Sequence, residues 1–182
     1  YTFSDKTYYS GYLSKYRSDV SEWAGGEQAD RSVSILMGYD NFSEEVLANI
    51  TADSKNTFTI IGNKRPYLLP DHCKQLGVVS DIAAAISGEV VISAAGQNSV
   101  AELLSLGKKV ILLPESRPYR EQEVHAAMLG RKGIALLGKE DFDGGAWAAL
   151  ILKARSLDVQ QEKLFTHDAA KEIAEKMKNW YG

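Results

Sequence analysis

Short apolar runs alternate with amphipathic stretches along the chain from residue 31 onward. The runs are rich in Val, Ile and Leu and are bounded by Gly or Pro, which is typical of strands buried on both faces. The predicted strands cover 33–37, 57–61, 90–93, 110–113 and 134–137. Apolar spacing and helix-end residues predict helices over 43–50, 81–86, 99–106, 120–129, 146–155 and 168–181. This alternation predicts an α/β fold, a Rossmann-like doubly wound parallel sheet with helices on both faces.

The first 30 residues differ in character from the rest of the chain. They are polar and tyrosine-rich, with glycines at three positions, and we interpret 1–30 as a linker and lead-in with a short helix around 18–23. Residues 31–182 then form one domain, which a chain of 182 residues fits well. The chain starts at Tyr1 rather than Met, so we expect it to be a piece of a longer protein.

Composition excludes several classes of protein. Hydrophobic residues make up 45% and charged residues 25%, so a core can form without disulfides or metals. A net charge of −3 offers no basic face for nucleic acid. The single Cys73 excludes an internal disulfide and fits a reducing cytoplasm. No apolar run reaches the roughly 18 residues of a membrane span, and no cleavable signal opens the chain. We therefore expect a cytoplasmic chain without a transmembrane segment.

Two loops are candidates for ligand binding, because doubly wound sheets bind ligands at the carboxyl ends of their strands. The loop over 93–99 is small, contains Gly96 and leads directly into a helix, whose free N–H groups and dipole suit a diphosphate. The same sequence also fits an ordinary turn, in which Ser99 caps the helix and Glu102 completes a capping box. The loop over 38–43 is less suited to phosphate because it carries the negative charge of Asp40.

Four stretches of sequence carry a resemblance to a known family. They are Leu76–Ile86, Val90–Gly107, which contains Val-Ile-Ser-Ala-Ala-Gly-Gln-Asn-Ser-Val-Ala-Glu, Val110–Pro114 and Arg120–Ala127. In order and spacing they resemble the C-terminal domain of family 28 glycosyltransferases, the family of the peptidoglycan N-acetylglucosaminyltransferase. The resemblance implies the C-terminal half of a GT-B fold, with 31–182 as a nucleotide-sugar-binding domain. The acceptor would bind to an N-terminal half or a partner chain.

The resemblance assigns the diphosphate and ribose contacts to one helix start. By position, Gly96, Asn98 and Ser99 would surround the diphosphate of the donor. Glu102, one turn into the helix, would bond the ribose hydroxyls. This fits the chemistry, because a carboxylate only accepts hydrogen bonds and can take two O–H donors at once.

The resemblance assigns the two ends of the donor to other loops. Val78 and Val79 would present their backbone groups to the edge of the uracil ring. Glu121 and Gln122, at the start of a later helix, would contact the donor sugar, whose hydroxyls suit carboxylate and amide groups.

The implied reaction is transfer of a sugar from a UDP-sugar to an acceptor hydroxyl with inversion at the anomeric carbon. The donor would be UDP-N-acetylglucosamine or a related UDP-hexose, and no metal or other cofactor is expected. The general base would lie in the missing half, so we nominate no catalytic residue in this chain. The isolated chain should bind donor without turning it over, and any contact with a membrane surface would come through the missing half.

Other functions on the same scaffold stay open. One is a UDP-sugar hydrolase or a 2-epimerase, and another is a non-catalytic donor subunit of a two-chain transferase. A nicotinamide-binding domain is disfavoured, because no Gly-x-Gly-x-x-Gly follows the first predicted strand. His72 and Cys73 are the only neighbouring pair of soft metal ligands, and their spacing is not that of a zinc site.

Overall fold

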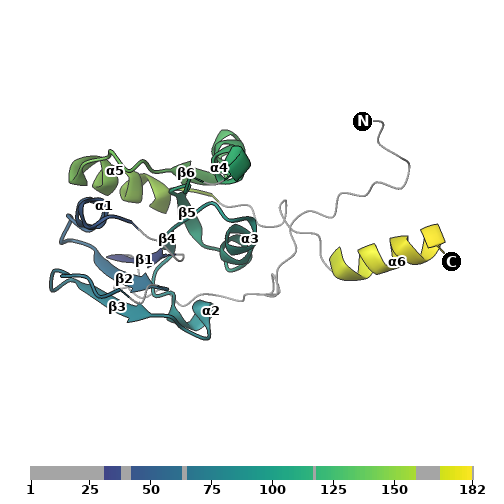
Figure 1. The fold of residues 1–182 in the computed structure, drawn as a ribbon, viewed down its shortest axis with the longest axis horizontal. Helices are drawn as coiled ribbons and strands as arrows, with labels where there is room; N and C mark the ends of the chain where they lie inside the picture. The colour runs from purple at the N-terminus through teal and green to yellow at the C-terminus, as the bar shows by residue number, and fades with distance from the viewer. Residues whose placement is uncertain (1–30, 38–41, 63–64, 117, 159–168, 182) are drawn as a thin grey trace.

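The computed structural model describes residues 31–37, 42–62, 65–116, 118–158 and 169–181. These residues form one six-stranded parallel sheet with the order β3-β2-β1-β4-β5-β6 (Figure 1). Its strands are β1 (Ser32–Leu36), β2 (Thr57–Ile61), β3 (Cys73–Gly77), β4 (Val90–Ser93), β5 (Lys109–Leu112) and β6 (Ala135–Leu137). The predicted helix around 18–23, the lead-in over 1–30 and the loop residues 38–41 lie outside the described residues.

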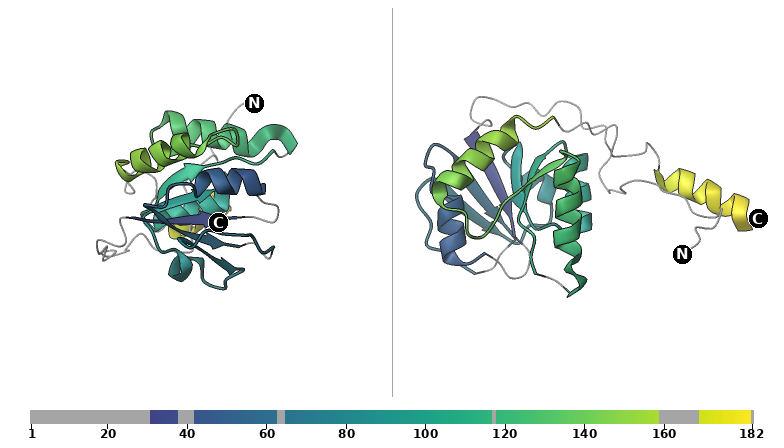
Figure 2. Two further views of the ribbon diagram at one scale, coloured as in Figure 1. Left: turned by 90° about the vertical axis from the view of Figure 1, so that its left-hand side faces the viewer. Right: turned by 90° about the horizontal axis from the view of Figure 1, so that it is seen from above.

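Helices lie on both faces of the sheet (Figure 2). They are α1 (Glu44–Ile50), α2 (Ile82–Ala85), α3 (Gln97–Ser105), α4 (Glu121–Arg131), α5 (Gly144–Arg155) and α6 (Ala169–Tyr181), with a 3-10 turn η2 (Pro118–Arg120) before α4. None of the helices in the described part of the chain combines the length and the apolar character needed to cross a membrane. The doubly wound α/β fold predicted from the sequence is confirmed.

One hydrophobic core lies on each face of the sheet, because successive strand residues point to opposite faces. In β1, Val33 and Ile35 join the core under α1 and α5, which also contains Trp147 with no exposed surface. Neighbouring strand residues such as Val91 and Val110 join the core under α3 and α4. Burial on both faces explains why the central strands are continuous apolar runs rather than alternating ones.

The edge strand β3 was not predicted. Its sequence, Cys-Lys-Gln-Leu-Gly, alternates half-buried with exposed residues, so it lacks the apolar run that identifies the central strands. It pairs only with β2, and the register shifts between Ile60 and Ile61. The five predicted strands are all present, and the predicted helices begin and end within two residues of the observed ones.

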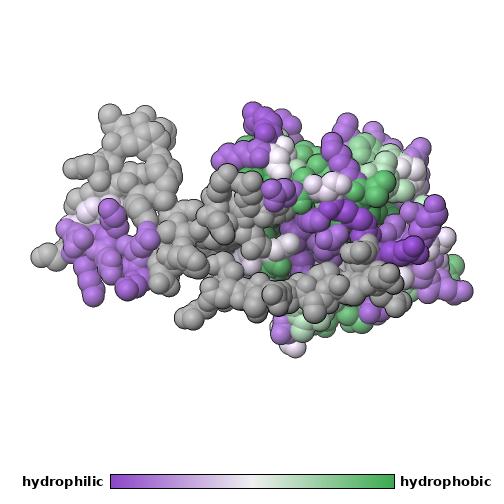
Figure 3. Space-filling model, turned by 180° about the vertical axis from the view of Figure 1, so that it is seen from behind, coloured by the Kyte–Doolittle hydropathy of each residue, from purple (hydrophilic) through white to green (hydrophobic). Residues whose placement is uncertain are grey.

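The C-terminal helix α6 lies apart from the sheet in Figures 1 and 2. Ile173, Met177 and Trp180 follow each other at helical spacing along it. The side of α6 seen in Figure 3 is hydrophilic. The sequence therefore gives α6 an apolar stripe beside a polar one.

Ion pairs gather at the amino ends of the strands. Lys109 contacts Glu89 at 3.0 Å, and Arg155 at the end of α5 approaches the same carboxylate at 3.8 Å. Arg155 also donates to Asn56 Oδ1 at 2.8 Å. Lys108 is 6% exposed and donates to the Gly88 carbonyl at 3.1 Å. This edge is thus held together by charged side chains.

We expect Gly88→Ala to destabilise the fold strongly. A Cβ at position 88 would lie 2.1 Å from the Ser32 carbonyl oxygen, so the backbone of β1 would have to move. Overpacking of this kind costs about 3 kcal/mol. Gly133→Ala is the matched control: its φ of +68° is unfavourable for alanine, but apart from its two chain neighbours no described residue has a heavy atom within 4 Å of the added Cβ. That change should cost only about 1 kcal/mol. Urea denaturation compares the two, and equal losses would contradict this account of Gly88.

Candidate functional site

A cavity of about 310 Å³ lies at the carboxyl ends of the strands. Residues at or after the ends of β1 to β5 contribute to it, so it extends across most of that edge of the sheet. It is lined by Leu36, Met37, Ile61, Gly62, Val78, Val79, Ile82, Ser93, Ala94, Gly96, Ser99, Glu115 and Gln122. The chain leaves β1 toward β2 on one side, and β4 pairs with β1 on the other. The cavity therefore sits at the topological switch point, where sheets of this type bind ligands.

The first turn of α3 forms the middle of the cavity wall. Gly96 is the N-cap, with φ −62° and ψ 129°, and no side chain caps the helix. The first bond within the helix runs from the Val100 N–H to the Gly96 carbonyl at 3.0 Å. The N–H groups of Gln97, Asn98 and Ser99 consequently have no partner inside the helix. These donors and the positive end of the dipole suit an anion.

The predicted capping box at Ser99 is wrong. Helix α3 starts at Gln97, so Ser99 is its third residue rather than its cap. Gly96 makes the turn into the helix with an extended backbone and no side chain, which a search for Ser, Thr, Asp or Asn caps does not detect. The helix therefore begins two residues before the predicted start, and the Ser99 N–H stays among the donors without a helical partner.

One end of the cavity is formed by the loops after β2 and β3. The Gly62 N–H donates to the Gly77 carbonyl at 2.6 Å, which joins the two loops. Gly62 has a φ of +103°, and a Cβ there would lie 2.3 Å from the Met37 carbonyl oxygen. Only glycine fits this close approach. Val78 and Val79 directly follow Gly77 in the loop after β3, and Val78 is 63% exposed. Gly62 has no side chain, so it offers only backbone groups to this wall.

The other end is formed by the loop after β5 and the first turn of α4. Gln122 is 8% exposed, and its Oε1 accepts a hydrogen bond from the Glu115 N–H at 3.0 Å. A backbone N–H donates only to the amide oxygen, so this bond fixes the orientation of the Gln122 amide. The His125 ring, one turn later in α4, donates from Nδ1 to the Ala95 carbonyl at 2.9 Å. This bond ties α4 to the loop that precedes α3.

Backbone strain lies between Glu115 and Gln122. Tyr119 and Arg120 are consecutive non-glycine residues with φ of 62° and 56°. Arg120 is bonded to Glu123 at 2.6 Å, and Tyr119 is 99% exposed. Such left-handed residues cost energy and collect at functional sites. The strain therefore accompanies the end of the cavity that contains Glu115 and Gln122.

Five of the eight predicted binding residues line the cavity: Val78, Val79, Gly96, Ser99 and Gln122. The other three lie outside the lining. Asn98 is exposed at the second position of α3, Glu121 is exposed at the first position of α4, and Glu102 is half-buried further along α3. The contacts of all eight residues with a ligand stay predictions.

Glu115 lines the cavity but was not predicted from the sequence as a binding residue. Among the described lining residues it is the one with an ionisable side chain. It follows Pro114 in a loop, and a single carboxylate in a loop gives no sequence signal of binding. Gly62 was also not nominated, because only the fold brings its loop beside the others.

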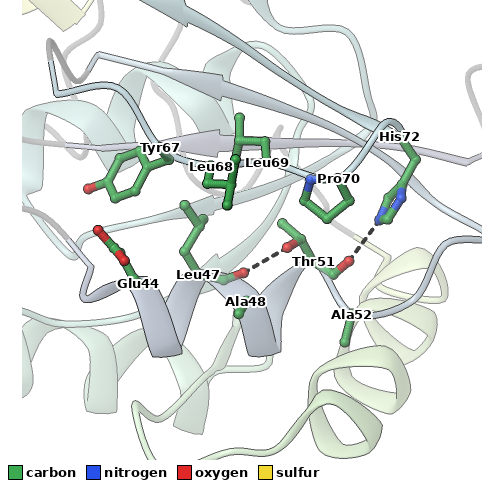
Figure 4. Close-up of a pocket in the computed structure, with 10 residues that line it drawn as sticks. All are labelled: Glu44, Leu47, Ala48, Thr51, Ala52, Tyr67, Leu68, Leu69, Pro70 and His72. Atoms are coloured by element: carbon green, nitrogen blue, oxygen red, sulfur yellow. Dashed lines mark hydrogen bonds between the residues drawn. The ribbon is translucent and has the colours of Figure 1, made fainter.

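A second cavity, of about 220 Å³, lies between α1 and the segment before β3 (Figure 4). Its walls are mostly apolar, and Figure 4 shows two hydrogen bonds among its polar groups. Thr51 donates from Oγ1 to the Leu47 carbonyl at 2.9 Å, and His72 Nε2 meets the Thr51 carbonyl at 2.8 Å. This cavity lies beside α1, away from the switch point, and offers few groups to orient a ligand.

The described residues offer little for metal binding. No three His, Cys, Asp or Glu side chains converge within the part of the chain that the structure describes. Burial raises the pKa of the Cys73 thiol, and a hydrogen bond with Thr51 opposes the shift. The thiol therefore stays protonated at neutral pH, which disfavours it as a metal ligand.

Comparison with known proteins gives one family match. The model of the glycosyltransferase family 28 C-terminal domain matches residues 27–179. A comparison with curated proteins finds no match.

Solved glycosyltransferase structures share the fold. The glycotransferase of kitacinnamycin has a TM-score of 0.64 and 16% identity, over 92% of this chain and 49% of that one. MurG of Acinetobacter baumannii has a TM-score of 0.63 and 14% identity, over 82% and 50%. Arabidopsis thaliana UGT89C1, solved with UDP-L-rhamnose, has a TM-score of 0.57 and 12% identity, over 86% and 41%. The sheet is therefore that of a GT-B glycosyltransferase C-terminal domain, and the chain spans about half the length of these structures or less.

We expect Ser99→Ala to leave the stability of the fold nearly unchanged, because no side chain caps α3. Asp143→Ala is the comparison, since Asp143 Oδ1 accepts from the Ala146 N–H at 2.8 Å and caps α5. Losing that cap should cost about 1 kcal/mol. Thermal denaturation of both variants checks the assignment. A loss for Ser99→Ala as large as that for Asp143→Ala would restore Ser99 as a cap.

Proposed function

We propose that this chain, which belongs to the glycosyltransferase family 28 C-terminal domain family, binds the UDP-sugar donor of an inverting glycosyltransferase. The donor is UDP-N-acetylglucosamine or a related UDP-hexose, and an N-terminal half or partner chain binds the acceptor. The observation that carries the proposal is the single cavity that runs along the carboxyl edge from the loop after β3 to the loop after β5.

The shape of the cavity fits an elongated ligand. Neighbouring strands are about 4.8 Å apart, so the four spacings from β3 to β5 span about 19 Å. A base, a diphosphate and a sugar joined end to end need a site of this kind. Backbone groups near Val78 and Val79 suit the base at one end, and the side chains of Glu115 and Gln122 suit the sugar at the other.

The diphosphate belongs between these ends, at the start of α3. Its charge meets the N–H groups of the first turn and the positive end of the helix dipole. None of the described lining residues carries a positive side chain, so the diphosphate is bound by backbone donors. When the sugar leaves, charge grows on the diphosphate, and fixed N–H donors stabilise it there without a metal ion.

The remaining predicted contacts complete the proposal. Glu102 accepts the two ribose hydroxyls, while Asn98 adds to the diphosphate site and Glu121 to the sugar site. UGT89C1, one of the structural neighbours, was solved with a UDP-sugar, and that ligand class supports a UDP-sugar here. The general base belongs to the acceptor-binding half, so the chain by itself binds donor and turns over none. We assign the whole enzyme to the cytoplasm.

The first test is nucleotide preference. The chain should bind UDP more tightly than UMP, because UMP lacks the second phosphate that reaches the first turn of α3. It should also bind UDP more tightly than ADP, because adenine presents a different hydrogen-bonding edge from uracil to the backbone near Val78 and Val79. Titration calorimetry with the three nucleotides measures this. Negligible heats for all three would reject nucleotide binding.

The second test concerns metal ions. EDTA should leave the affinity for UDP unchanged, because the proposed diphosphate contacts are backbone N–H groups rather than a bound cation. The measurement repeats the UDP titration with EDTA and with added Mg²⁺. A tenfold loss of affinity in EDTA, about 1.4 kcal/mol, would show that a metal ion takes part.

A further inference from the structure

The cavity contains a carboxylate where the proposed ligand carries negative charge. Glu115 is half-buried and lines the same cavity as the first turn of α3. A carboxylate beside a diphosphate would weaken binding by charge repulsion. The side chain must therefore face a part of the ligand that is not the diphosphate, or it would oppose the function of the site.

Its position in the fold places Glu115 away from the diphosphate. It follows β5, one strand beyond β4, whose loop leads into α3. Its own N–H is bonded to Gln122 Oε1 at 3.0 Å, which holds the two residues side by side. Gln122 is buried and stands in the first turn of α4. Glu115 thus lies at the end of the cavity opposite Val78 and Val79.

The two side chains offer complementary hydrogen-bonding groups. The Glu115 carboxylate only accepts hydrogen bonds, whereas the Gln122 amide still has its Nε2 hydrogens to donate once Oε1 is used. Sugar hydroxyls both donate and accept, so adjacent hydroxyls match such a pair. A carboxylate has about four lone-pair positions, so it can accept a hydroxyl beside the interaction it already makes in the chain.

Resting on the proposed function, we propose that Glu115 determines which donor sugar is accepted, by taking a hydrogen bond from a hydroxyl of the hexose. Gln122 donates to a neighbouring oxygen of the same sugar. The substrate class is then a UDP-hexose that keeps the hydroxyl facing Glu115. A deoxy sugar lacking that hydroxyl forfeits this charge-assisted hydrogen bond and should bind more weakly.

The experiment is calorimetric titration of the full chain with UDP and with UDP-N-acetylglucosamine, UDP-glucose and UDP-galactose. The sugar that binds wild type most tightly is then compared with its monodeoxy analogues. The variants are Glu115→Gln, which removes the charge, and Glu115→Asp, which keeps the charge but shortens the reach. Glu140→Gln is the control, since Glu140 is exposed, lies after β6 and is not a lining residue. Thermal denaturation checks that each variant is folded.

Glu115→Gln should weaken the best UDP-sugar about tenfold, because bonds to a charged acceptor are about twice as strong as neutral ones. UDP itself should bind within twofold of wild type, and Glu140→Gln should change neither ligand. One deoxy analogue should bind wild type about tenfold more weakly than its parent sugar, and Glu115→Gln should distinguish the two less well, because its neutral amide oxygen accepts a weaker bond. Glu115→Asp should fall between wild type and Glu115→Gln.

Several outcomes would overturn the assignment. Equal weakening of UDP and UDP-sugar would make Glu115 a structural residue, and tighter binding of both would place its carboxylate against the diphosphate. Unchanged affinities would also reject a hydroxyl contact. Any of these with normal UDP binding by wild type overturns this inference alone. Absence of UDP binding by wild type overturns the proposed function as well.

Discussion

Parallel pairing of β1 on both of its sides determines where this molecule can bind a ligand. β1 pairs with β2 from Ser32 to Leu36 and with β4 from Val33 to Leu36. The chain leaves β1 toward one half of the sheet, and β4 opens the other half, so the loops at their carboxyl ends diverge. The cavity occupies the crevice between these diverging loops. Without the reversal of strand order, the loops after β3 and β5 would not border one space.

Helix capping separates two kinds of helix start in the described residues. Side chains cap α1, α2 and α5 through Ser43, Asp81 and Asp143. The starts of α3 and α4 have no side-chain cap, and these two helices supply Gly96, Ser99 and Gln122 to the cavity. A capping side chain bonds to the N–H groups of the first turn and would compete with an anion for them. Leaving α3 uncapped loses some helix stability and keeps its donors for a ligand.

The sequence predicts those parts of the fold that depend on local patterns. Central strands such as 57–61 and 90–93 are apolar runs, and they fold as predicted. β3 was not predicted, because an edge strand needs no such run. The start of α3 was placed wrongly, because Gly96 is an N-cap without a side chain. Glu115 was not predicted as a lining residue for a different reason. Its place in the cavity depends on Gln122 and on the loop before α3, which only the three-dimensional fold brings near.

Charge is divided between the two edges of the sheet. At the amino edge, Lys109 and Arg155 surround Glu89, and burial lowers the pKa of Lys108 while Glu89 opposes that shift. At the carboxyl edge, the cavity has backbone donors and the carboxylate of Glu115. A site built from backbone donors constrains the path of the chain more than its side chains. This is consistent with a fold retained at 16% sequence identity and a TM-score of 0.64.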